Sequence, residues 1–183
     1  MNRIQRVVVS LAWLLLSFSV YAVELSSAEK KLLENSISYY MEKVYPPEIP
    51  RAFDVHRLGC PVCGDGIKKH GKYSWKMDPD KPFKLQCPEC KTVFPDNDFV
   101  AYWKSGFKDK SLLKGKFVDD GRGWRPKPDE PKYWFVAYYA QWTHYKNRIP
   151  DQMAAAYERT GEAGFARRGL AVLAKYAERY PDY

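Results

Sequence analysis

The chain has 183 residues, and its 30 basic and 22 acidic side chains give a formal net charge of +8. Hydrophobic residues make up 45% of the sequence and charged residues 28%, which excludes a disordered protein, and the negative mean hydropathy excludes a polytopic membrane protein. Four cysteines are too few for a disulfide-stapled miniprotein, so their role has to be inferred from their spacing.

Residues 1–22 have the three parts of a secretory signal peptide. Arg3 and Arg6 form a basic start, an apolar run follows, and the small residue Ala22 ends the segment. The run is shorter than the ~20 residues that span a bilayer, and an uncleaved membrane anchor is the alternative. We therefore expect a basic protein exported to the periplasm or the extracellular space, with no stable membrane span after cleavage. Its expected partners are acidic polysaccharides and not nucleic acid.

Residues 23–58 are predicted to hold one helix and a proline-rich linker. Ser26 and Glu29 have the spacing of a capping box, and apolar residues recur at helical spacing from Ala28 to Val44. The prolines that begin at Pro46 end this helix, because proline lacks the N–H group that a continuing helix needs.

Residues 59–99 are predicted to form a small zinc-ribbon-like module. Cys60 and Cys63 make one C-P-x-C pair, Cys87 and Cys90 make another, and short alternating runs between them indicate small strands. Two such pairs can place four thiolates tetrahedrally around Zn²⁺, and a shell of four protein ligands leaves no position for a catalytic water. We therefore expect a structural zinc ion. Two disulfides, which exported proteins favour, are the alternative.

Residues 100–132 are predicted to be a loop. Asp119 and Asp120 precede Gly121 in a stretch punctuated by glycines. Adjacent acidic residues in such a loop can bind a cation or sugar hydroxyls, and the alternative is that they cap a turn. We name them as candidate substrate-binding residues because loops carry function more often than the core does.

Residues 133–183 are predicted to form helical hairpins, and the first helix has an unusual composition. It runs from Tyr133 to Tyr145 with seven aromatic rings and no Lys, Arg, Asp or Glu, so it should be enclosed on all sides. Tyr138 and Trp142 are candidate substrate-binding residues, since aromatic faces pack against sugar rings; a purely structural place in the core is the alternative. His144 is expected to be a structural histidine with its hydrogen bonds satisfied.

Two further helices are expected after it. The second runs from Pro150 to Arg159 and stops at Gly161, and the third runs from Glu162 to about Tyr180. The short connection requires the two helices to be antiparallel. The third helix is amphipathic, and we expect its apolar stripe, which includes Leu170, to be left without a partner.

Several blocks of the sequence, in this order, resemble the N-terminal part of heparinase II/III-like polysaccharide lyases. The blocks are Cys60–Gly64, Trp75–Asp78, Pro82–Cys90, Phe94–Phe99, Ser105-Gly106, Asp119–Gly121, Tyr133–Tyr139, Ala156-Tyr157, Thr160-Gly161 and Tyr176–Asp182. The resemblance implies a mainly α fold with an (α/α) toroid of helical hairpins and a C-terminal β-sandwich. It also implies cleavage of uronic-acid polysaccharides by β-elimination.

This chain departs from that pattern after about two hairpins. We expect it to be the start of the toroid, without the β-sandwich and without the catalytic residues, so that the missing C-terminal part of the same protein is one of its partners. Two other classes are the alternatives. One is a non-catalytic zinc-stabilised module that binds acidic polysaccharide; the other is a zinc-ribbon nucleic-acid binder, which the export signal disfavours.

Overall fold

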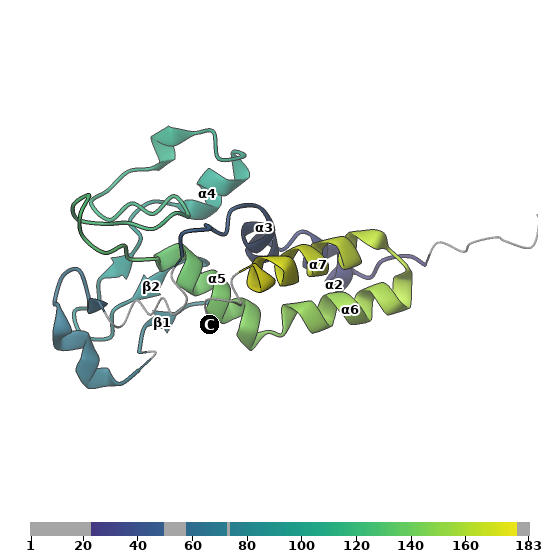
Figure 1. Ribbon diagram of the computed structural model, residues 1–183, viewed down its shortest axis with the longest axis horizontal. Helices are drawn as coiled ribbons and strands as arrows, with labels where there is room; N and C mark the ends of the chain where they lie inside the picture. The colour runs from purple at the N-terminus through teal and green to yellow at the C-terminus, as the bar shows by residue number, and fades with distance from the viewer. Residues whose placement is uncertain (1–22, 50–57, 73, 179–183) are drawn as a thin grey trace, which may run out of the picture.

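The computed structural model describes residues 23–49, 58–72 and 74–178 (Figure 1). The expected signal peptide, residues 1–22, and the expected end of the third helix at Tyr180 lie outside these ranges. No helix in the described ranges is both long enough and apolar enough to cross a bilayer.

The described part of the chain is mainly helical and carries one small antiparallel sheet. Its α-helices are α2 (Ser27–Leu33), α3 (Ser36–Lys43), α4 (Phe99–Lys104), α5 (Phe135–Lys146), α6 (Ile149–Thr160) and α7 (Ala163–Ala177). Two 3-10 helices are η2 (Asp65–His70) and η3 (Lys110–Leu112), and the strands are β1 (Lys76–Met77), β2 (Leu85–Gln86) and β3 (Val93–Phe94).

The first helical segment is broken in two, where the sequence predicted one helix from Ala28 to Val44. The capping box of Ser26 and Glu29 begins α2 as predicted. The Oδ1 atom of Asn35 then accepts hydrogen bonds from the backbone N–H groups of Ile37 and Ser38, at 2.8 and 3.3 Å, and so begins α3. Asparagine competes with the helix for backbone donors and favours such a cap, so a new helix starts here.

The three strands pair in the order β1-β2-β3, and each has only two residues. Met77 lies opposite Leu85, which lies opposite Phe94 on the other side. Leu85 and Phe94 are fully buried. The sheet therefore presents one apolar face to the helical part of the molecule.

Helix α5 lies between the sheet and the remaining helices (Figure 1). It begins at Phe135 and not at the predicted Tyr133, because Tyr133 forms a two-way backbone bridge with Trp124. Its residues from Phe135 to Ala140 are all buried, so the enclosure predicted for the whole helix is confirmed for its first half and is wrong for its second half. The second half emerges from the core, and Tyr145 is exposed.

The α6–α7 hairpin extends from the end of α5 (Figure 1). Pro150 lies in the first turn of α6, and Gly161 ends the helix with a φ of 67°, as predicted. Met153 and Phe165 are buried between the two helices and α2. Leu170 and Leu173 remain 65% and 50% exposed, which confirms that the apolar stripe of α7 has no partner in the described structure.

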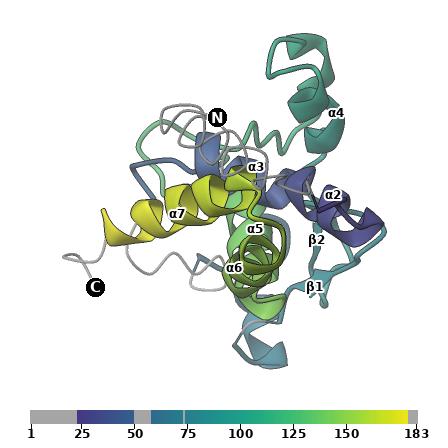
Figure 2. The same cartoon turned by 90° about the vertical axis from the view of Figure 1, so that its right-hand side faces the viewer.

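Residues 100–132 are more ordered than the predicted loop. They contain most of α4 and all of η3, and this segment projects from the rest of the molecule (Figures 1 and 2). Phe99 and Tyr102 of α4 are buried, and the later part of the segment returns to the core through Phe117 and Asp119.

Candidate metal centre and the neighbouring cavity

The four cysteines of the two C-P-x-C pairs meet at one point. Their sulfur atoms all lie within 4.8 Å of one another. The Cys60 and Cys90 sulfurs are 3.7 Å apart, as are those of Cys63 and Cys87. All four thiols are free, so the structure contains neither of the disulfides considered as the alternative.

Each pair sits on a tight turn that exposes its sulfurs to a common centre. The backbone of Cys60 exchanges hydrogen bonds with Gly64, and Cys87 accepts one from the N–H of Lys91. Gly64 and Lys91 occupy equivalent positions after the two pairs, and both have a positive φ, 56° and 64°. The two turns are therefore alike, although the first uses glycine and the second does not.

This arrangement fits a metal ion. Tetrahedral coordination by four thiolates at the usual metal–sulfur distance separates the sulfurs by about 3.8 Å, close to the two separations of 3.7 Å observed. Burial raises the pKa of the Cys60 thiol far above its ordinary value. A cation is what allows such buried thiols to become thiolates together. The four cysteines can therefore bind a metal ion, as predicted.

A cavity of about 320 Å³ lies between β1 and α5. One wall comes from the segment between the two cysteine pairs: Trp75, Met77 and Pro79. The other comes from α5 and the residue that ends it: Tyr139, Trp142, Thr143, Lys146 and Asn147. The cavity is thus aromatic on both sides and has a lysine, an amide and a hydroxyl at its edge.

Lys146 is the charged side chain in the lining of this cavity, and the Asp78 carboxylate is close enough to act on the lining residue Tyr139. The lining contains no carboxylate, and none of the ion pairs among the described residues involves Lys146. Trp75 is almost fully buried, and its indole nitrogen has no hydrogen-bond partner. A buried donor without a protein partner is uncommon.

The two aromatic residues singled out on α5 have different positions. Trp142 is partly exposed and lines the cavity, whereas Tyr138, one turn earlier, is buried and is not part of the lining. Sequence reasoning missed Tyr139 and Lys146. Both belong with Trp142 to one helical face, since positions i, i+3 and i+7 point the same way, so this spacing could have identified them.

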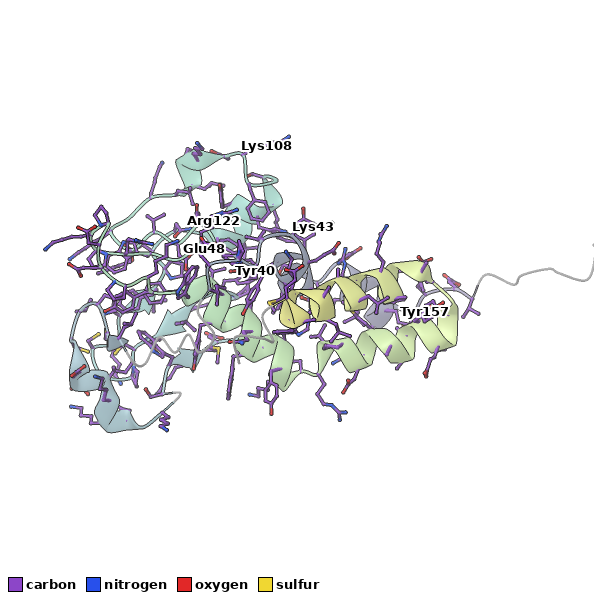
Figure 3. All side chains as sticks on the ribbon, viewed as in Figure 1. Tyr40, Lys43, Glu48, Lys108, Arg122 and Tyr157 are labelled. Carbon is purple, nitrogen blue, oxygen red and sulfur yellow. The ribbon has the colours of Figure 1, made fainter. Side chains whose placement is uncertain are left out.

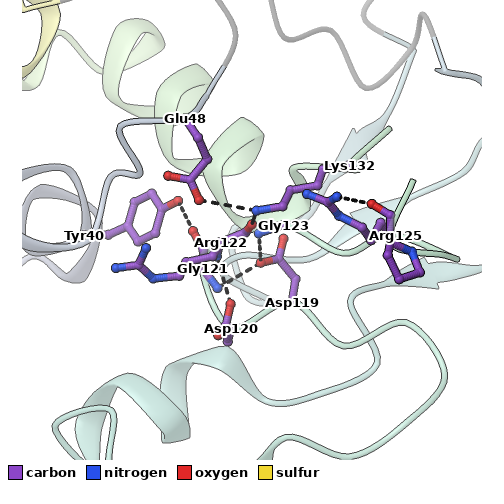
Figure 4. A network of polar contacts seen from close by, with 10 residues as sticks. Tyr40, Glu48, Asp119, Asp120, Gly121, Arg122, Gly123, Arg125 and Lys132 are labelled. Carbon is purple, nitrogen blue, oxygen red and sulfur yellow. Dashed lines mark hydrogen bonds and ion pairs between the residues drawn. The ribbon is translucent and has the colours of Figure 1, made fainter. Parts of the chain in front are cut away.

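Asp119 lies in the interior and organises its loop (Figure 4). Its Oδ1 atom accepts hydrogen bonds from the N–H groups of Gly121 and Gly123, at 2.8 and 2.9 Å. Its Oδ2 atom accepts one from the N–H of Val136, in the first turn of α5, at 3.0 Å. Burial raises the pKa of this carboxyl to about 6, against the opposing effect of the three hydrogen bonds.

Asp120 points the other way and accepts a hydrogen bond from the N–H of Arg122 at the surface (Figure 4). Both acidic residues therefore hold turns, which is the capping alternative left open by the sequence. Asp119 in particular has no route to a polysaccharide, because it is fully buried. The cavity beside α5, and not this loop, is the better candidate site.

His144 is buried near the end of α5, but the expectation that its hydrogen bonds are satisfied is wrong. Its Nε2 atom has no hydrogen-bond partner, and its ring lies 6.3 Å from that of Tyr176. Desolvation lowers the pKa of this imidazole to about 4. The side chain is therefore neutral in the folded protein at physiological pH.

Comparisons with known proteins do not identify this chain. No family model, no curated protein and no solved structure matches it.

We expect one metal ion per chain in protein purified under reducing conditions, measured by elemental analysis together with a thiol count after denaturation. Cys87→Ser should remove the metal and lower the melting temperature, because three thiolates no longer close the shell. A metal-free protein with two disulfides would contradict this expectation.

Asp119→Ala should lower the free energy of unfolding by about 3 kcal/mol, because three N–H groups, two of them fully buried, lose their acceptor. Urea denaturation measures the loss. Asp120→Ala is the matched control and should lose about 1 kcal/mol or less, since its one partner is at the surface. Equal losses from the two variants would show that Asp119 does not organise the loop.

The buried His144 should make the protein less stable in acid. Its folded pKa of about 4 lies below the ordinary value of 6.5, so its contribution is present above pH 6.5 and is lost as the pH falls toward 4. Between pH 7 and pH 5 this loss is about 2 kcal/mol.

Asp119 acts in the opposite direction over the same range. Because the pKa of Asp119 is raised on folding, the folded state binds a proton at a higher pH than the unfolded state does. The contribution of Asp119 to stability therefore rises as the pH falls through about 6. The free energy of unfolding of His144→Gln should therefore fall less between pH 7 and pH 5 than that of the wild type. Identical pH profiles would exclude a buried neutral His144.

Proposed function

We propose that this chain binds acidic, uronate-containing polysaccharide outside the cytoplasm, as the N-terminal part of a heparinase II/III-like lyase. The observation that carries the proposal is the aromatic cavity with an unpaired lysine at its edge. Binding sites for small ligands are concave and mostly apolar, with a few polar groups that fix the orientation of the ligand. The strongly basic composition favours an anionic partner.

Four residues of the α5 wall have defined roles in this proposal. The Trp142 ring offers an apolar face for the C–H groups of a pyranose ring. The Lys146 ammonium group then pairs with the uronate carboxylate, in a charge-assisted hydrogen bond that a neutral sugar cannot form. Thr143 and Asn147 provide hydrogen-bonding groups for ring hydroxyls at the same edge.

We propose zinc as the metal of the four-cysteine centre, in a zinc-ribbon-like module. Four thiolates in tetrahedral geometry favour zinc or an iron–sulfur cluster, and zinc has no redox chemistry that an oxidising compartment would disturb. Four cysteine ligands fill the shell, so the ion supports folding and takes no part in a reaction.

The lyase assignment is supported by the sequence resemblance, and the mainly helical architecture is compatible with it. β-Elimination requires a base for the C5 proton, neutralisation of the uronate carboxylate and an acid for the departing oxygen. Among the described residues, the lining of the cavity includes no histidine and no carboxylate. We assign binding of the polysaccharide, and not the proton transfers, to this cavity.

The binding proposal is tested by calorimetric titration with hexamannuronate and with mannohexaose, its neutral counterpart. Lys146→Ala should weaken hexamannuronate binding about tenfold or more and leave mannohexaose binding unchanged, because only the charged pair is lost. Trp142→Ala should weaken the binding of both sugars, because it removes the apolar face.

The matched controls are Lys108→Ala and Tyr157→Ala, which lie on two separate projections of the molecule (Figure 3). Both residues are exposed, and both variants should bind as the wild type does. If Lys108→Ala weakened hexamannuronate binding as much as Lys146→Ala does, general charge attraction would explain the binding, and the proposed site would be contradicted. Release of unsaturated product by this chain alone would contradict the division between binding and catalysis.

A further inference from the structure

The cavity is built from two parts of the chain that are held in place by different forces. The residues of one wall, Trp75, Met77 and Pro79, lie between the two cysteine pairs in the sequence. The other wall belongs to α5, outside that module. The cavity therefore exists only when the cysteine module and α5 are both in position.

The α5 wall is held by the apolar core. Phe135 to Ala140 are all buried, and the first turn of α5 is fixed to the buried Asp119 through Val136. Helix α5 also packs against α3 and α6.

The opposite wall has much weaker support of its own. It is carried by β1, which has two residues and pairs only with β2, also of two residues. Strands this short are not stable in isolation. The chain runs from β2 directly into Cys87, so the four-cysteine centre fixes the strand that in turn holds β1.

Trp75 connects the metal centre, the wall and the core. Its ring packs edge-on against Phe94 of β3, at 5.7 Å between centroids, and against Phe135 of α5, at 6.1 Å. Phe94 follows the second cysteine pair by four residues and stacks on Phe135 at 4.9 Å. A shift of the sheet would therefore move Trp75 away from α5 and open the cavity.

We propose that metal binding at the four cysteines and ligand binding in the cavity are thermodynamically coupled, because the metal holds one of the two cavity walls in place. This inference rests on the proposed function, since it assigns a regulation to the same site. A ligand that binds only the assembled cavity must raise the affinity for the metal, and the metal must raise the affinity for the ligand by the same factor.

The test measures zinc affinity by competition with a chromophoric chelator, under reducing conditions, with and without saturating hexamannuronate. We expect the sugar to tighten zinc binding about tenfold in the wild type, within the usual range of coupling between sites. Lys108→Ala should show the same tightening. Trp142→Ala keeps all four cysteines and should show none, which also excludes zinc binding by the sugar itself as the cause.

A second measurement distinguishes the failure of the coupling from the failure of the proposed function. If the zinc-loaded wild type does not bind hexamannuronate, the binding proposal fails and the coupling with it. If zinc-loaded and zinc-free protein bind the sugar equally, the coupling alone is overturned. Far-UV circular dichroism of the zinc-free protein should show retained helices together with weakened sugar binding. If zinc removal also unfolded the helices, the weaker sugar binding would not come from the β1 wall alone, and the coupling as proposed would be overturned.

Discussion

The small sheet can persist only if something other than its own hydrogen bonds holds it. Its strands have two residues each, and Leu85 and Phe94 are the fully buried side chains that face the helices from it. The convergence of four cysteine sulfurs at the ends of this sheet supplies a cross-link in the right place. Cys60 and Cys87 are themselves buried, so the cross-link is continuous with the apolar core. The position of Trp75, and with it one side of the cavity, depends on this constraint.

A second constraint acts from the interior of the helical part. The Asp119 carboxylate joins the glycine-rich loop to the first turn of α5 through three backbone N–H groups. A carboxylate near a helix N-terminus is favoured by the helix dipole, but full burial opposes its charge. His144 is buried at the other end of the same helix, and desolvation keeps it neutral at physiological pH. The aromatic helix thus has an unusual titratable group near each end, and their effects on stability oppose one another in mild acid.

Sequence patterns were reliable where the signal is local. The four cysteines, the capping box at Ser26 and the glycine stop at Gly161 depend on residues a few positions apart, and the structure has each of them. The patterns were wrong where a local competitor interrupted a periodic run. Asn35 caps a new helix within an otherwise regular stretch, and the bridge between Trp124 and Tyr133 delays the start of α5. The spacing of apolar residues predicts neither event. It does not record a side chain that caps the backbone, and the bridge joins residues that are nine positions apart.

The sequence by itself determined which residues can bind a metal, that α5 has no charged side chain before Lys146, and that the chain is basic. Ligand type, spacing and charge are properties of the chain whatever its conformation. Only the tertiary structure decided that Asp119 faces inward while Asp120 faces the solvent, and that Trp142 lines a cavity while Tyr138 does not. Neighbouring residues of the same type differ only in what packs against them, and that depends on segments distant in the sequence. The cavity belongs to this second class, because its two walls are more than 55 residues apart along the chain and meet only through the core.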